Sequence, residues 1–155
     1  CSLVGSENVY KRQEQDAMPW LAAAALDGEV LAMENGVDTV IGPSGTRLSG
    51  GQAQRLALAR TLAHPRPVLV LDDPFSALDR KTEEQVFDNL RKMTAGSTVL
   101  LISHRLYLFP QMDGVLWIQD GKAVCAAHEE LIAQNPQYAA LVNAQEGGEQ
   151  DEPEK

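Results

Sequence analysis

The sequence has few cysteines, no excess of positive charge and no long apolar run. Its two cysteines, Cys1 and Cys125, form no disulfide pattern, which suits a reducing cytosol. Lysine and arginine number 13 against 22 aspartates and glutamates, a net charge of −9, which argues against a nucleic-acid-binding surface. No apolar run reaches the ~18 residues of a transmembrane helix, so we expect no membrane-spanning segment within these residues.

The sequence also lacks a phosphate-binding loop of the pattern G-x-x-x-x-G-K-[ST]. In many ATPases this loop wraps the phosphates of the bound nucleotide with backbone N–H groups. The residues that are present can therefore contact a nucleotide, but they lack the loop that would hold one of their own.

Residues 48–52, Leu-Ser-Gly-Gly-Gln, are the most informative segment that is present. Ser49 with Gln52 three residues later fits a capping box at the start of a helix. Glycine at positions 50 and 51 allows close approach to the backbone, and the helix N-terminus favours negative charge. The segment therefore predicts a helix start that binds an anion, with a ligand-free glycine-rich helix start as the alternative.

Apolar patterns and turn residues predict an α/β fold. The expected elements are a helix over 16–33, a helix over about 50–63, a strand over 68–71, a helix over 81–93, a strand over 98–102, a hairpin over 115–126, and helices over 129–133 and 137–144. Strand, helix and strand at this spacing predict a right-handed parallel crossover. Both strands are continuously apolar, so we expect them to be covered on both faces. Apolar residues at 56–59 predict a largely buried second helix.

Asp72 and His104 lie just past the ends of the two predicted strands. Ligands of parallel sheets bind beyond the carboxyl ends of the strands, so both residues are expected on one edge. Mg²⁺ takes one or two carboxylates together with phosphate oxygens and water, which makes Asp72 the candidate magnesium ligand. We interpret His64 and His128, which lack such a setting, as surface or loop residues.

Four motifs in register resemble the nucleotide-binding domain of ABC transporters. They are Leu48 to Gln52 as the family signature, Val68 to Asp72 as Walker B, Ser76 to Asp79 as the D-loop, and Ser103-His104 as the switch histidine. The resemblance covers about residues 16–145 and implies a P-loop-NTPase-like ABC ATPase domain, here a helical subdomain plus the C-terminal part of the parallel-sheet core. Residues 36–42 further resemble the exporter loop that faces the transmembrane helices, with Val40 where the family often has glutamate.

The resemblance implies a role for each of these residues. The signature residues would bind an ATP held by another subunit: Leu48, Ser49, Gly50, Gly51 and Gln52. Ser49, Gly50 and Gly51 would contact its γ-phosphate. Asp72 would bind Mg²⁺ through water, His104 would contact the γ-phosphate, and Ser76 and Asp79 would lie at the dimer interface. Asp79 taken alone fits the cap of the following helix equally well.

Asp73 stands where the family usually has a glutamate that positions or activates the attacking water. Aspartate keeps the charge but is one methylene shorter, and displacement of a base by ~1 Å costs on the order of 10²-fold in rate. The sequence thus predicts a weak or degenerate hydrolytic site, which is typical of one half of a heterodimeric exporter. The alternative is that aspartate works normally at this position.

The implied cofactors are ATP and Mg²⁺. The implied partners are a second ABC nucleotide-binding domain, with a heterodimer favoured over a homodimer, and a transmembrane domain upstream on the same chain. The implied location is the cytoplasmic face of the cell membrane. Two alternatives remain: a soluble ABC-type ATPase of DNA repair or chromosome maintenance, whose long coiled-coil heptads are absent here, and an inactive truncated relic that binds ATP very weakly on its own.

The composition changes at both ends of the chain. Residues 1–13 resemble a translated sequencing adapter, and we expect this segment to be non-native, with an ordinary surface segment as the alternative. Residues 14–66 are the expected helical subdomain, and residues 67–145 run from Walker B to the C-terminal part of the ATPase core. Residues 146–155 are rich in glutamate and predict a disordered acidic tail, with an interaction tail as the alternative.

Overall fold

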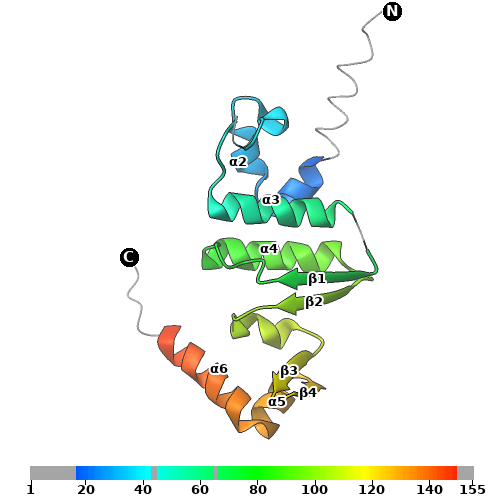
Figure 1. The fold of residues 1–155 in the computed structure, drawn as a ribbon, viewed down its shortest axis with the longest axis vertical. Coiled ribbons are helices and arrows are strands. Elements are labelled where there is room, and N and C mark those ends of the chain that lie inside the picture. Colours follow the sequence, from blue (N-terminus) through cyan, green and yellow to red (C-terminus); the bar gives the residue numbers. More distant parts are fainter. Residues whose placement is uncertain (1–16, 43–44, 65, 150–155) are drawn as a thin grey trace, which may run out of the picture. The chain divides into compact units, whose positions relative to one another are not determined.

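The computed structural model describes residues 17–42, 45–64 and 66–149 (Figure 1). They form two compact units, one up to Ser103 and one from His104 on. After a helix at residues 17–23, the elements are α2 (Asp27–Leu31), η1 (Gly36–Asp38), α3 (Gly50–Leu62), β1 (Val68–Asp72), α4 (Arg80–Met93), β2 (Thr98–Ile102), η2 (Leu106–Gln111), β3 (Val115–Gln119), β4 (Lys122–Ala126), α5 (His128–Gln134) and α6 (Pro136–Glu149). The α/β class is confirmed. Within the described ranges, no helix has both the length and the apolar character needed to cross a bilayer.

The single helix predicted over residues 16–33 is wrong, because the chain breaks it near Ala25. Ala25 adopts a left-handed φ of 51°. Its N–H donates to the carbonyl of Ala22 at 3.0 Å, and the N–H of Leu26 donates to the carbonyl of Leu21 at 2.9 Å. This is the bond pattern of a Schellman motif with alanine in place of the usual glycine. The break turns Leu26 inward, where it packs with Leu21 in a buried apolar cluster.

Replacing Ala25 by glycine is expected to stabilise the chain by about 1 kcal/mol, because alanine at positive φ is strained and glycine is not. Urea denaturation of the 155-residue chain measures the change. The control is Ala22→Gly, which lies within the helix at residues 17–23 and should destabilise the chain. A loss of stability in both variants would contradict this account of the helix end.

Helix α3 follows its predicted bounds closely, but it is buried on one face only. Leu58, Ala59 and Leu62 are buried, whereas Ala57 is exposed. The prediction of a helix buried nearly all round is therefore wrong in the described part of the chain. Small apolar residues such as alanine fit an exposed helical surface as well as a buried one, because alanine has the highest intrinsic helix propensity.

The strands β1 and β2 pair in parallel, with Val68 opposite Thr98 and Asp72 opposite Ile102. Their predicted coverage on both faces is wrong for the described residues. Leu69 and Leu71 are buried, but Val68 and Val70 are 58% and 60% exposed, and Leu100 and Ile102 of β2 are also exposed. A continuously apolar strand is typical of a sheet with a packing layer on each face. The described residues cover one face of these strands.

Helix α4 links β1 to β2 and carries an amphipathic pattern that places Val86, Phe87 and Leu90 in the core. Phe87 meets Phe75 edge to face, with ring centroids 6.4 Å apart. Phe75 is fully buried directly after the Pro74 turn. This aromatic pair holds the segment that follows β1 against α4.

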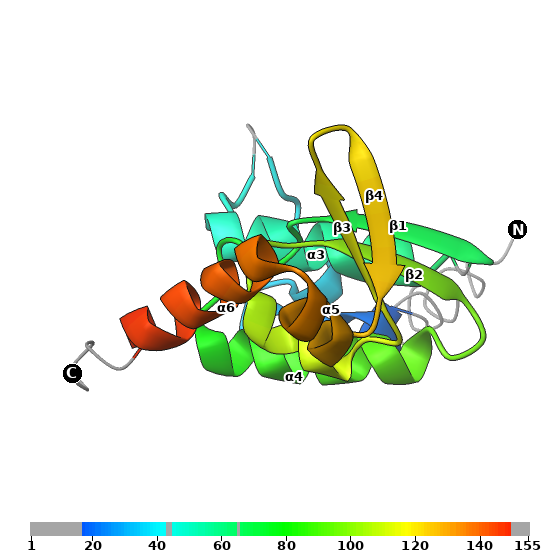
Figure 2. The same ribbon diagram turned by 90° about the horizontal axis from the view of Figure 1, so that it is seen from below.

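The second unit consists of η2, a hairpin and two helices (Figure 2). Strands β3 and β4 pair antiparallel as predicted, and Asp120 and Gly121 form the turn with φ of 50° and 73°. Positive φ at both central residues is the requirement of a type I′ hairpin. Helix α6 continues to Glu149, beyond the predicted start of the acidic tail at residue 146. Residues 150–155 and the expected non-native segment 1–13 lie outside the described residues.

The prediction that His128 is a surface or loop residue is wrong, because His128 is buried at the start of α5. Its Nδ1 lies 2.7 Å from the hydroxyl of Tyr138, which is fully buried. Trp117 packs edge to face on the same tyrosine, with centroids 5.2 Å apart. Burial, and after it the charge of Glu129, raises the pKa of the Tyr138 hydroxyl. This cluster forms the core of the second unit.

Candidate functional site

The signature segment forms the predicted capping box at the start of α3. Ser49 has extended backbone angles, and its Oγ accepts a hydrogen bond from the N–H of Gln52 at 3.2 Å. The N–H of Ser49 donates to Oε1 of Gln52 at 2.8 Å. The first bond of the helix ladder runs from the N–H of Ala53 to the carbonyl of Ser49. The N–H groups of Gly50 and Gly51 come before that ladder, at the positive end of a helix of 13 residues.

The two glycines of this segment have different surroundings. A Cβ built on Gly51 would lie 2.9 Å from the carbonyl oxygen of Ala77, which is too close for any side chain. A Cβ built on Gly50 would meet only the Cβ of Ala77, at 4.0 Å. Gly51 is thus required by packing within the chain, whereas Gly50 lies exposed and has space for a side chain.

Helix α3 also holds the D-loop, Ser76 to Asp79, through the side chain of Gln54. Nε2 of Gln54 donates to Oγ of Ser76 at 2.6 Å, and Oε1 accepts from the N–H of Ala77 at 3.0 Å. The structure therefore brings together two motifs that are more than 20 residues apart in the sequence. Gln54 lies two residues after the signature, but its role depends on a distant loop, so the sequence alone assigns it none.

Asp79 caps helix α4, as its alternative interpretation predicts. One carboxylate oxygen accepts from the N–H of Thr82 at 3.0 Å, and the other accepts from its hydroxyl at 2.6 Å. These hydrogen bonds, that of the hydroxyl first, lower the pKa of the Asp79 carboxyl. Capping and a place at a dimer interface are compatible, because the carboxylate is exposed.

Asp72 and Asp73 place two carboxylates beyond the end of β1. Asp72 is the exposed last residue of the strand. Asp73 has a left-handed φ of 43°, its N–H donates to the carbonyl of Ile102 at 2.8 Å, and its carbonyl accepts from the N–H of Ser76. Asp73 is half-buried, so the exposed carboxylate of Asp72 is the better placed of the two for Mg²⁺ that also binds phosphate oxygens and water. In the described ranges, no three His, Cys, Asp or Glu side chains gather into an all-protein metal site.

His104 begins the second unit and is exposed. Its carbonyl accepts a hydrogen bond from Nε2 of Gln145 at 2.6 Å, and Oε1 of the same glutamine accepts from the N–H of Leu106 at 3.1 Å. Gln145 thereby ties the backbone of the switch segment to α6. The expectation that His104 shares an edge with Asp72 stays a prediction.

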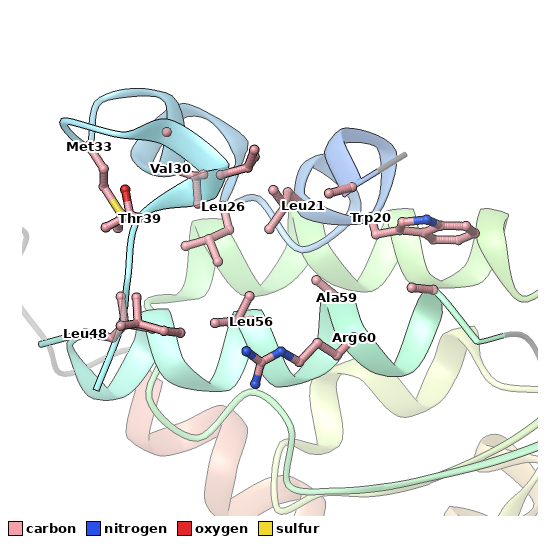
Figure 3. A pocket seen from close by; sticks show the side chains of 15 residues that line it. Trp20, Leu21, Leu26, Val30, Met33, Thr39, Leu48, Leu56, Ala59 and Arg60 are labelled. Carbon is pink, nitrogen blue, oxygen red and sulfur yellow. The ribbon is translucent and has the colours of Figure 1, made fainter. Parts of the chain in front are cut away.

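An apolar cavity of about 320 Å³ lies beside α3 in the first unit (Figure 3). Its lining includes Trp20, Leu26, Val30, Met33, Leu48 and Leu56, with Arg60 as the charged member. Leu48 thus places the first residue of the signature segment at the wall of this cavity.

The sequence matches a known family and several of its characterised members. Residues 5–76 match the family described as ABC transporter. The chain is 44% identical over 122 residues to the ATP-dependent lipid A-core flippase of Burkholderia thailandensis, which covers 78% of the chain. The chain belongs to the ABC transporter family. It is also 46% identical over 139 residues, or 89% of its length, to the ATP-dependent lipid A-core flippase of Vibrio vulnificus.

A solved ABC transporter structure has the same fold. The structure of a bacterial Atm1-family ABC exporter with ATP bound covers 84% of the chain with a TM-score of 0.76 and 30% identity. The chain spans 20% and 24% of the two flippases and 23% of that exporter chain. The ABC nucleotide-binding domain expected from the four motifs, and its exporter type expected from residues 36–42, are confirmed.

Proposed function

We propose that this chain is part of the ATP-hydrolysing domain of an ABC exporter at the cytoplasmic face of the cell membrane. A second nucleotide-binding domain and a transmembrane domain are its partners, and MgATP is its ligand. ATP bound between the two nucleotide-binding domains drives their association, which the transmembrane domain converts into transport. The family and the exporter relatives support the whole-protein activity, and the geometry of the signature supports the part played by this chain.

The observation that carries the proposal is the pair of glycine N–H groups at the start of α3. The capping box occupies the amides of Ser49 and Gln52, which leaves those of Gly50 and Gly51 for a ligand. Two adjacent N–H groups at a helix N-terminus suit a terminal phosphate. Gln54 hydrogen-bonds the D-loop to the same helix. The phosphate-binding residues and the proposed dimer interface are therefore coupled through α3.

Two ATP sites lie between the paired nucleotide-binding domains, and each is formed by residues of both domains. The carboxylates of this chain belong to the site that its own signature does not complete. Asp72 would hold Mg²⁺ through water, Asp73 would orient the attacking water, and His104 would donate to the γ-phosphate. Mg²⁺ supplies neutralisation of the charge that develops on the phosphate oxygens. Since each signature completes the site of the opposite domain, this chain contributes its signature to one site and Asp73 to the other.

Removal of Mg²⁺ tests the proposal in the assembled transporter that contains this chain, reconstituted into lipid vesicles. We expect ATP turnover to fall to background with a chelator and to return with added Mg²⁺. Asp72→Asn should raise the Mg²⁺ concentration needed for half-maximal turnover by about tenfold or more, because one carboxylate is a large share of the protein's hold on the ion. Asp88→Asn on the exposed side of α4 is the matched control.

An unchanged Mg²⁺ requirement in Asp72→Asn would contradict the metal assignment. Turnover that needs DNA and occurs without a membrane domain would instead support the soluble ABC ATPase alternative.

A further inference from the structure

Among the described residues outside the family motifs, Glu29 and Arg55 contact the signature through their side chains, Arg55 at the carbonyl of Gly51. Glu29 of α2 accepts a hydrogen bond from Nε2 of Gln52 at 2.6 Å, across 23 residues of sequence. The same carboxylate pairs with the guanidinium of Arg55, one turn further along α3. We infer that Glu29 is a positioning residue of the signature, which acts through Gln52 and fixes the shape of the phosphate-binding loop. This inference rests on the proposed function.

The side-chain amide of Gln52 is nearly symmetric in shape. Oxygen and nitrogen of a glutamine side chain have nearly the same size, so packing alone does not decide which end faces a neighbour. Oε1 of Gln52 must face the N–H of Ser49 to accept its hydrogen bond, as it does at 2.8 Å. A reversed amide would place an NH₂ group against that N–H and leave the capping box half made. An ionised carboxylate accepts hydrogen bonds and donates none. Glu29 therefore selects the orientation of the Gln52 amide in which the nitrogen faces the carboxylate.

Arg55 keeps the Glu29 carboxylate in place. Its Nη2 bonds the second carboxylate oxygen, and its Nη1 donates to the carbonyl of Ala25 at the break before α2. Arg55 is largely buried, with 12% of its side chain exposed, which favours a fixed geometry over a loose surface pair. The hydrogen bond from Gln52, and then the contact with Arg55, lower the pKa of the Glu29 carboxyl, so both contacts favour its ionised form. Glu29, together with Arg55, thus links the helix break at Ala25 to the start of α3.

A double-mutant cycle tests whether Glu29 acts through Gln52. In the assembled transporter, Glu29→Ala and Gln52→Ala are each expected to lower kcat for ATP by about tenfold, with the KM for ATP changed less than twofold, because a displaced catalytic contact affects rate more than binding. The double variant should also fall only about tenfold, since both changes act by loosening the same hydrogen bond from the N–H of Ser49. Glu29→Gln should keep most of the activity, because its amide oxygen can still accept from Gln52. Glu84→Ala, which removes the exposed Arg80–Glu84 pair, is the control.

Amide exchange supplies a readout of loop shape that does not require transport. In the 155-residue chain, the N–H of Ser49 should exchange about tenfold faster in Glu29→Ala than in the wild type or in Glu84→Ala. Unchanged exchange at Ser49 would overturn the inference. So would a double variant whose kcat falls about a hundredfold, or a Glu29→Ala variant that keeps full turnover while Gln52→Ala loses it. Full turnover in both Gln52→Ala and Gly50→Ala would instead overturn the proposed function together with the inference.

Discussion

Replacing Gly50 by alanine is expected to lower ATP turnover of the assembled transporter by about 100-fold while leaving the fold intact. The new methyl group has room within the chain, because its nearest neighbour would be the Cβ of Ala77 at 4.0 Å. It would occupy the exposed side from which a phosphate must approach the N–H groups. Displacement of the phosphate by ~1 Å is sufficient for a loss on the order of 10²-fold. Turnover at saturating MgATP measures the effect.

Two control measurements separate a lost ligand contact from a damaged fold. The thermal midpoint of Gly50→Ala should equal or exceed that of the wild type, since alanine is the better helix former. Gly51→Ala should instead lower the midpoint, because its Cβ would lie 2.9 Å from the Ala77 carbonyl. Full turnover in Gly50→Ala, with normal stability, would show that no phosphate approaches this loop.

Extending Asp73 to glutamate is expected to raise ATP turnover by about 10-fold to 100-fold at the site to which Asp73 belongs. The backbone of Asp73 is held by hydrogen bonds to Ile102 and from Ser76, so side-chain length alone sets the reach of the carboxylate. The extra methylene would bring it closer to the attacking water. Glutamate tolerates the φ of 43° less well than aspartate, so a small loss of thermal stability is expected with the gain.

The clearest measurement combines this change with Gly50→Ala. In a heterodimer, the signature of this chain completes the partner's ATP site, so Gly50→Ala inactivates that site. The site that contains Asp73 is then the remaining source of turnover. Asp73→Glu added to Gly50→Ala should then restore activity above that of Gly50→Ala alone. Asp73→Asn in the same background should remove the remainder, and Asp88→Glu on exposed α4 should change nothing. No gain from Asp73→Glu in either background would contradict a weakened site, and a gain only with Gly50 intact would indicate a homodimer.

Features that depend on neighbours in the sequence could be predicted. The capping box of Ser49 and Gln52 spans one helical turn, and the Asp120-Gly121 turn needs only two residues that tolerate positive φ. The parallel pairing of β1 and β2 also follows from a local pattern, because a strand, a helix and a strand at this spacing have few arrangements.

Features that depend on distant residues could not be predicted. Ala25 itself favours a helix, and the position of the break depends on the burial of Leu26 and on Arg55 some 30 residues later. The role of Gln54 depends on the D-loop, which lies 22 residues further along the chain. His128 has no distinctive neighbours, and only the packing of α6 brings Tyr138 to it. Such contacts are decided by tertiary packing, which overrides local pattern.

The central claim is that the signature of this chain contacts the terminal phosphate of ATP. ATP with a photoreactive group on its γ-phosphate tests this directly in the assembled transporter. Cleavage after arginine releases residues 48–55 as one peptide, Leu-Ser-Gly-Gly-Gln-Ala-Gln-Arg, which mass spectrometry can identify. We predict a light-dependent adduct on this peptide that excess ATP prevents and that Gly50→Ala reduces. Saturable nucleotide binding that labels other peptides and leaves residues 48–55 unlabelled would contradict the claim.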